Sequence, residues 1–320
     1  MPAVSWSPLT RAPVGVRGPA ASCVLPRAEL DLHGTLLGGQ SFRWRAAASA
    51  SAATGGELLN GEALPVWRTV MAKQLVQVWR EGERLAAAMN PGPFDAGLLH
   101  QYFDLNHSVE EILAAWTGDE HLQAAAVRYP GLRILQQDPW ETLIAFILSQ
   151  NSNVPRITGN IASLCREYGD EITAGWHSFP DPVQLARASV EDLRAMGLGY
   201  RAEYVFAAAR RCSDIGVQWL HALASVPYSE ARDCLTLGGD HWGKVSGVGP
   251  KVADCILLFS LRHYDAFPVD VHVRRAMERW YGAEAQFTSR YDSVAEFGRA
   301  RFGRYAGYAQ QYLFHRERAG

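Results

Sequence analysis

The hydrophobic pattern of this 320-residue chain changes once along its length, near Asn106. Before that point, Val66–Met71 and Gln74–Arg80 carry β-branched and aromatic residues in partial alternation, which is typical of strands. After it, apolar residues recur at helical spacing, as in Pro155–Tyr168. A block of strands followed by a block of helices predicts the α+β class, with an antiparallel sheet in the N-terminal part.

Capping signals outline the helices and suggest where one domain gives way to the next. Ser108 and Asp138 each precede a glutamate three residues later, the arrangement of a capping box, and Ser189 opens a further helix. From these starts we place a β-rich domain at residues 1–130 and a helical domain at residues 131–320. The low-complexity stretch AAASASAATGG at 46–56 predicts a flexible surface loop between strands.

Composition narrows the class of protein. With 48% hydrophobic residues the chain can bury a sizeable core, and it has no run of about eighteen apolar residues that could span a bilayer. Its five cysteines are never spaced C-x-x-C, which argues for a reducing compartment and against a zinc site or a four-cysteine iron–sulfur cluster. We therefore expect a soluble protein with no metal, no iron–sulfur cluster and no membrane contact.

The charge balance leaves nucleic-acid binding open. The net charge is −2, but the stretch from Leu261 to Gly320 has ten arginines against seven acids. Because a sum over the whole chain can hide a basic face, this tail fits either DNA contact or an ordinary mixed surface.

The stretch GVGPKVADC, residues 247–255, places a lysine just behind a glycine-rich turn. Gly247 and Gly249 leave backbone amides unobstructed at the start of a predicted helix, Lys251–Leu261, where the helix dipole favours anions. A phosphate could bind there without the amine. Lys251 is one of only three lysines in the chain. A lysine amine can lose its proton and attack carbon, which would make Lys251 a nucleophile. Lys251 could equally be a solvated residue in the first turn of the helix.

Two neighbouring patterns need separate interpretations. Residues 238–245, GGDHWGKV, match the start of a nucleotide-binding P-loop, but Val245 stands where a hydroxyl should bind magnesium, so we reject an ATPase. Downstream, PVDVH at 268–272 puts Asp270 just before another helical run, where taken alone it would be an ordinary N-cap.

Six separate motifs then occur in one order. They are GQSFRW at 39–44, QDP at 137–139, NSNVPRIT at 151–158, GLGYRA at 197–202, the glycine hairpin with PVDVH, and YAGYAQ at 305–310 with Phe314 beyond. Together they resemble the eukaryotic-type 8-oxoguanine DNA glycosylase/lyases from Pro26 to Phe314. The resemblance implies an all-helical, two-lobed region with a helix-hairpin-helix motif, an active site in the cleft between the lobes, and no cofactor.

The resemblance also implies a base pocket and a reaction. Phe314 and Cys255 would sandwich the flipped base, Gln310 would bond its Watson–Crick edge, and the Gly39 carbonyl would accept from N7–H, where guanine carries an acceptor instead. For the chemistry, Lys251 would attack C1′ of the sugar and allow β-elimination, while Asp270 would stabilise the oxocarbenium-like sugar.

The remaining family positions would hold the DNA. By resemblance, Asn151, Arg156 and Arg201 bind the orphaned cytosine and Tyr200 is the wedge beside it; alone, the two arginines would be surface charges. His272 and the amides near Gly247 and Gly249 would contact phosphates, which positions the duplex without specifying sequence. The chain departs from the family pattern by an insertion at 236–242, by the Ala/Ser loop, by Ser152 in place of asparagine, and by Ser246 in place of proline.

The expected function is excision of 8-oxoguanine opposite cytosine followed by strand cleavage, by a monomer acting on double-stranded DNA with an oxidised purine. Two alternatives stay open. A related glycosylase with another base specificity is one, although an endonuclease III type would need cysteines after Asp270 and the last cysteine is Cys255. A non-catalytic DNA-binding homologue is the other, for which Lys251 and Asp270 together would be unnecessary. The resemblance implies a location in the nucleus, with the mitochondrion as a second location.

Overall fold

The computed structural model describes residues 4–10, 12–13, 15–47, 58–59, 62–63, 65–238 and 244–318. Most of the Ala/Ser stretch at 46–56 and most of the insertion at 236–242 lie outside the described residues. Within the part that is described, no helix is long and apolar enough to cross a membrane.

The N-terminal part is built on a six-stranded antiparallel sheet in the order β1-β2-β8-β7-β6-β3. The strands are β1 (Ser7–Pro8), β2 (Ala20–Val24), β3 (Arg45–Ala47), β6 (Val66–Met71), β7 (Gln74–Glu81) and β8 (Arg84–Asn90). A separate two-stranded ladder joins β4 (Leu58–Leu59) to β5 (Glu62–Ala63). The predicted strands at 66–71 and 74–80 are therefore confirmed.

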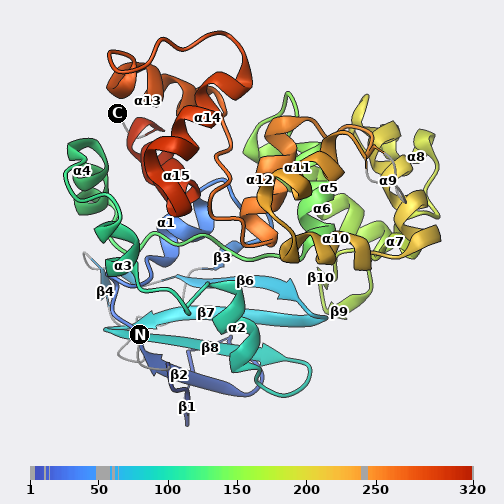
Figure 1. The fold of residues 1–320 in the computed structure, drawn as a ribbon. Coiled ribbons are helices and arrows are strands. Elements are labelled where there is room, and N and C mark those ends of the chain that lie inside the picture. Colours follow the sequence, from blue (N-terminus) through green and yellow to red (C-terminus); the bar gives the residue numbers. More distant parts are fainter. Residues whose placement is uncertain are drawn as a thin grey trace.

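Both faces of the central strands are covered. Alternate residues of a strand point to opposite sides of the sheet, so each face can be followed separately. Val76 and Val78 of β7 are fully buried on the face that packs against α1 (Leu32–Leu37) and α2 (Ala96–Tyr102). Trp79, on the other face, packs with the N-terminal segment that runs before β2. The sheet is thus a buried platform beneath the helices (Figure 1).

The rest of the chain is mainly helical. Its helices are α3 (Val109–Ala114), α4 (Glu120–Arg128), α5 (Pro139–Leu148), α6 (Val154–Tyr168), α7 (Pro182–Leu185), α8 (Val190–Ala195), α9 (Arg201–Ile215), α10 (Gln218–Ala222), α11 (Tyr228–Thr236), α12 (Pro250–Ser260), α13 (Val271–Tyr281), α14 (Tyr291–Phe302) and α15 (Ala306–Arg318). α12 packs against α5 and α11, whereas α15 packs against α13 and α4. Figure 1 shows two groups of helices above the sheet, with α12 on the side of its group that faces α13–α15.

The α+β class and the two-lobed helical region are confirmed, with two local corrections. The helical region contains one hairpin, β9 (Glu171–Thr173) with β10 (Trp176–His177), whose turn uses Gly175 at φ +75°. The predicted capping boxes also differ. Ser108 flanks α3 but makes no side-chain cap bond, and Glu141 of α5 pairs with Arg43 instead of its own N-cap. Nothing tests the domain boundary at 130, which stays a prediction.

Candidate active site

The predicted nucleophile occupies the first turn of α12. Gly249 is the N-cap, Pro250 opens the helix and Lys251 follows. Proline suits this position because its fixed φ is helical and its missing N–H would be unpaired there anyway. Lys251 is therefore held at a helix N-terminus and is half-buried.

The turn before α12 requires glycine at one position. Gly247 has φ +80°, and a Cβ placed there would lie 2.6 Å from Cδ2 of Tyr204. The Gly247 carbonyl accepts a hydrogen bond of 2.9 Å from Gln150 Nε2, which ties the hairpin to the loop after α5. At Gly249, in contrast, a Cβ would meet open space. The second glycine thus leaves the helix N-terminus accessible to a ligand.

Asp270 is the N-cap of α13, and it uses only one of its carboxylate oxygens for that role. Its Oδ1 accepts from the backbone N–H groups of His272 at 2.9 Å and Val273 at 2.8 Å. No described residue donates to its Oδ2. The capping interpretation and the catalytic interpretation of Asp270 are therefore compatible, because capping leaves one oxygen free.

The six residues predicted to bind the base or do chemistry line one cavity. They are Gly39, Lys251, Cys255, Asp270, Gln310 and Phe314, and the lining also includes Gly38, Phe146, Phe259, Pro268 and Gln311. These residues come from the loop after α1, from α5 and α12, from the segment before α13, and from α15. Segments far apart in the sequence thus meet at one hollow, as the interpretation required.

Cys255 contributes a neutral surface to this cavity. The residue is 3% exposed, and burial raises the pKa of its thiol to about 12, while the nearby Lys251 charge acts in the opposite direction. The thiol is therefore protonated at neutral pH and acts as a packing surface instead of a nucleophile.

Phe314 and Gly39 both line the cavity and lie close to each other. Gly39 has φ +77°, and a Cβ built on it would lie 3.6 Å from Cζ of Phe314. The Phe314 ring also meets the His272 ring edge-on, with centroids 5.7 Å apart. His272 thereby lies beside the base cavity as well as in the first turn of α13.

A second hollow, open to solvent, lies on the other side of Lys251. It is lined by Ser149, Gln150, Asn151, Gly249, Pro250, Lys251, Val252 and Tyr291. Asn151 Nδ2 donates to the Tyr200 hydroxyl at 3.1 Å, so these two residues already meet in the unbound protein. Lys251 thus lies between the base cavity and the residues predicted to face the orphaned cytosine.

The two predicted cytosine-binding arginines differ in exposure, since Arg201 is buried whereas Arg156 is exposed. Arg201 is 3% exposed, donates to the backbone carbonyls of Gln150 and Asn151, and lies over the Tyr200 ring. Arg156 donates to the Gly197 carbonyl at 3.1 Å. The structure brings Asn151, Tyr200 and Arg201 together, with Arg156 tied to the neighbouring 197–202 loop.

The loop that carries Gly39 is fixed by residues that the sequence interpretation did not assign. Gln40 is fully buried; its Nε2 donates to the carbonyls of Thr35 and Arg133, and its Oε1 accepts from Leu135 N–H. Gln137 Nε2 donates to the Gln40 carbonyl at 2.6 Å. The GQSFRW and QDP motifs therefore bind each other across the chain.

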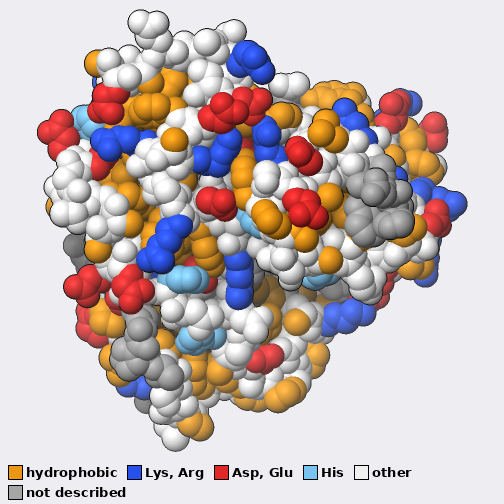
Figure 2. All heavy atoms as spheres, viewed as in Figure 1, with side chains coloured by type: hydrophobic (Ala, Val, Ile, Leu, Met, Phe, Trp, Pro, Cys, Tyr) orange, Lys and Arg blue, Asp and Glu red, His pale blue; other side chains and the backbone are white. Residues whose placement is uncertain are grey.

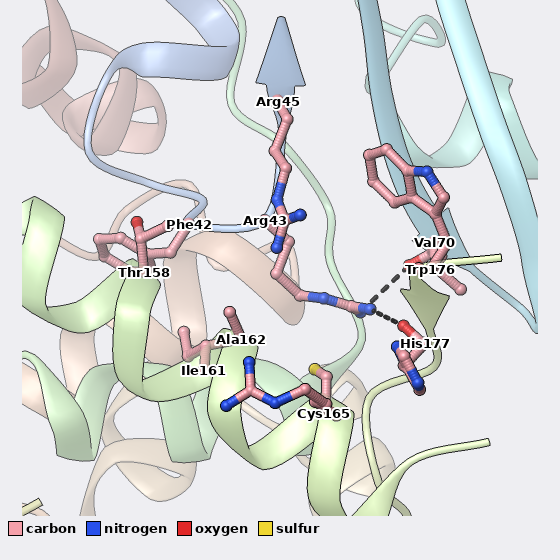
Figure 3. Close-up of a pocket in the computed structure, with 12 residues that line it drawn as sticks. Phe42, Arg43, Arg45, Val70, Thr158, Ile161, Ala162, Cys165, Trp176 and His177 are labelled. Atoms are coloured by element: carbon pink, nitrogen blue, oxygen red, sulfur yellow. Dashed lines mark hydrogen bonds between the residues drawn. The ribbon is translucent and has the colours of Figure 1, made fainter. Parts of the chain in front are cut away.

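Arg43, in the same motif, joins the sheet to the helical region. Its guanidinium donates to the carbonyls of Val70 and His177, as Figure 3 shows, and it pairs with Glu141 of α5 at 2.7 Å. Figure 3 also shows Arg45 in the same pocket, near Trp176. None of the predicted catalytic residues lines this pocket.

The distribution of surface charge does not indicate where the active site lies. On the face in Figure 2, Lys and Arg side chains are interspersed with Asp and Glu. Among the described residues, no group of three or more His, Cys, Asp or Glu could hold a metal ion.

Comparisons with known proteins agree with this geometry. Residues 22–143 match the family described as 8-oxoguanine DNA glycosylase, N-terminal domain, and residues 144–298 match the HhH-GPD superfamily of base excision DNA repair proteins. An N-glycosylase/DNA lyase of Saccharomyces cerevisiae is 33% identical over 92% of this chain and 85% of its own length.

Solved structures give the same result. A structure described as MBOgg1 in complex with low affinity DNA ligand is 31% identical, with a TM-score of 0.81 over 98% of this chain and 99% of that one. The Clostridium acetobutylicum 8-oxoguanine glycosylase/lyase, in complex with double-stranded DNA containing cytosine opposite 8-oxoG, is 26% identical, with a TM-score of 0.79 over 98% of both chains. This chain therefore belongs to the 8-oxoguanine DNA glycosylase/lyase family of helix-hairpin-helix base-excision repair enzymes.

Proposed function

We propose that this enzyme flips 8-oxoguanine out of DNA, releases it by attack of Lys251, and then cuts the strand at the same site. The observation that carries the proposal is the meeting of Lys251 and Asp270 at one cavity with Gly39, Cys255, Gln310 and Phe314. An amine and a carboxylate beside a base-sized cleft are what a combined glycosylase and lyase needs.

The reaction begins at the sugar. The Lys251 Nζ lone pair forms a bond to C1′ as the bond from C1′ to the base breaks, and the base leaves with that electron pair and takes up a proton. The free Oδ2 of Asp270 stabilises the positive charge that develops on the sugar. The nitrogen of Lys251 then loses a proton and forms a double bond to C1′ as the bond from C1′ to O4′ breaks and O4′ takes up a proton, which leaves an imine between Lys251 and C1′.

Strand cleavage follows from the imine. Loss of a proton from C2′ breaks the bond between C3′ and the 3′ phosphate oxygen, so the phosphate leaves with the electron pair. Water then hydrolyses the imine and returns Lys251 as the free amine. One lysine thereby serves both steps.

Recognition divides between the two hollows beside Lys251. In the base cavity, the Gly39 carbonyl selects the N7–H of 8-oxoguanine, because guanine would oppose it with a second acceptor. Asn151 at the outer hollow, together with Arg156 and Arg201, binds the orphaned cytosine, and Tyr200 fills the gap. The enzyme thus prefers lesions opposite cytosine. In this proposal it acts as a monomer, in the nucleus and also in the mitochondrion.

The test is covalent trapping. With a duplex that carries 8-oxoguanine opposite cytosine, borohydride should reduce the imine to a stable protein–DNA adduct in the wild type. Lys251→Gln should form no adduct yet keep its fold and its duplex binding. A wild type that yields no adduct and no strand break with any oxidised-purine duplex would contradict the proposal and favour a non-catalytic DNA-binding protein.

Asp270→Asn separates the catalytic role of Asp270 from its capping role. Asparagine is as good an N-cap as aspartate, so the free energy of unfolding should change by less than about 1 kcal/mol. Base release in single turnover should fall by about 100-fold or more, because the carboxylate charge is lost. If the rate of base release stays normal, Asp270 is a cap alone.

A further inference from the structure

The base cavity contains a second buried glutamine beside the predicted base-reading Gln310. Gln311 is 3% exposed and Gln310 is 4% exposed, and both line the cavity. Gln311 Nε2 donates to Gln310 Oε1 at 2.9 Å. The two amides therefore form one connected unit at the wall of the cavity.

One end of this unit has no protein partner. Within the described part of the chain, no donor reaches the buried Gln311 Oε1. A buried acceptor without a donor costs roughly 1–3 kcal/mol, so such atoms are rare unless a ligand completes them. Packing alone does not explain a glutamine at this position, because an apolar side chain would fill the same space without leaving a buried acceptor unpaired.

The hydrogen-bonding groups that the glutamine pair leaves available match in kind those of a guanine-type base. Along its Watson–Crick edge such a base has the O6 acceptor, the N1–H donor and the exocyclic 2-amino donor. With Gln311 Nε2 already bonded to Gln310 Oε1, the pair still offers the Gln310 amide donor, the second lone pair of Gln310 Oε1, and Gln311 Oε1. Gln310 alone satisfies two of the three groups on the base.

We propose that Gln311 is a specificity-determining residue whose Oε1 accepts a hydrogen bond from the 2-amino group of the flipped base. The proposal rests on the proposed function, since it requires that the base enters this cavity. The enzyme would then distinguish 8-oxoguanine from 8-oxohypoxanthine, which differs by the absence of the 2-amino group.

The experiment combines a substitution of Gln311 with the removal of the 2-amino group from the base. Single-turnover base release is measured for duplexes with 8-oxoguanine or 8-oxohypoxanthine opposite cytosine, using the wild type and Gln311→Met. The wild type should release 8-oxoguanine about 10-fold faster or more, which corresponds to one good hydrogen bond. Gln311→Met should lose most of this preference by slowing on 8-oxoguanine only.

Gln136→Met is the matched control. Gln136 is also buried and bonds the Leu258 carbonyl and the Arg262 N–H, but it does not line the base cavity. It should lower the melting temperature and leave the base preference unchanged. Gln311→Met should leave the melting temperature within a few degrees of the wild type, because it removes an unpaired acceptor along with one bond.

Three results would overturn the proposal while leaving the glycosylase function intact. They are an equal wild-type rate on the two bases, an unchanged preference in Gln311→Met, and an equal loss of rate on both bases in that variant. A wild type that releases neither base would instead contradict the proposed function itself.

Discussion

Among single side chains, His315 gives the clearest link between burial and pH. It follows Phe314, its ring packs against Tyr129 at 5.4 Å, and a Cβ on Gly38 would lie 2.7 Å from its Nε2. Burial, with a smaller contribution from Arg318, lowers the pKa of His315 from 6.5 to about 4. The ring is therefore neutral in the folded protein at neutral pH.

This shift predicts a loss of stability in mild acid. Between pH 6.5 and about 4 the unfolded chain binds a proton at His315 that the folded protein does not, so the free energy of unfolding falls as the pH falls through that window. His315→Gln cannot take up the proton and should lose about 2 kcal/mol less between pH 7 and pH 4.5. Urea unfolding at both pH values measures the difference, and equal losses in the two proteins would contradict the assignment.

Among the secondary-structure elements, α12 is positioned by a buried carboxylate behind Lys251. Asp254 is fully buried and accepts from the hydroxyls of Tyr228 of α11 at 2.6 Å and Tyr291 of α14 at 2.5 Å. The Tyr291 oxygen also accepts from Val269 N–H at 3.3 Å, next to Asp270. One network therefore links the helix of the nucleophile to the segment of the carboxylate.

A pair of tyrosine variants tests this link. Tyr291→Phe should cost about 1–3 kcal/mol in unfolding free energy and also slow base release, because Val269 and hence Asp270 lose a fixed partner. Tyr228→Phe should cost a similar amount of stability with a normal rate, since Tyr228 does not contact the Asp270 segment. Single-turnover rates beside urea unfolding curves make the comparison; equal rates in the two variants would refute the link.

The sequence predicted these elements well because strand and helix periods are local properties of the chain. β7 and α6 could be read from residues that are neighbours in sequence. The incomplete capping box at Asp138 could not, because the Glu141 that should have completed it is paired with Arg43, 98 residues away. The Gln40 contact with Leu135 spans 95 residues and left no periodic signal either.

At the level of the whole molecule, buried arginines join the sheet to the helices. Arg43 and Glu141 form an ion pair at 2.7 Å with side chains 11% and 22% exposed. Arg43→Met should destabilise the protein by about 3 kcal/mol, because Glu141 loses its partner in a poorly hydrated site. Adding Glu141→Gln should restore part of the loss, which a double-mutant cycle from denaturant unfolding would measure; simple additivity would mean that the two residues are not coupled.

The candidate site shows how far a sequence alone can lead. Lys251, Asp270 and the other members of the cavity were found through motifs that keep their order along the chain. Gln311 was not, because nothing in the YAGYAQ motif distinguishes a second glutamine on α15 from an ordinary polar residue. Only burial and the unpaired oxygen mark it, and both are properties of the folded protein.

The late position of α15 in the chain has a consequence for synthesis. Gln310, Gln311 and Phe314 complete a cavity whose first member, Gly39, is made almost at the start. A nascent chain that still lacks α15 therefore has Lys251 and Asp270 but not the residues that complete the base cavity. We therefore expect base release to begin only once α15 has docked and completed the cavity.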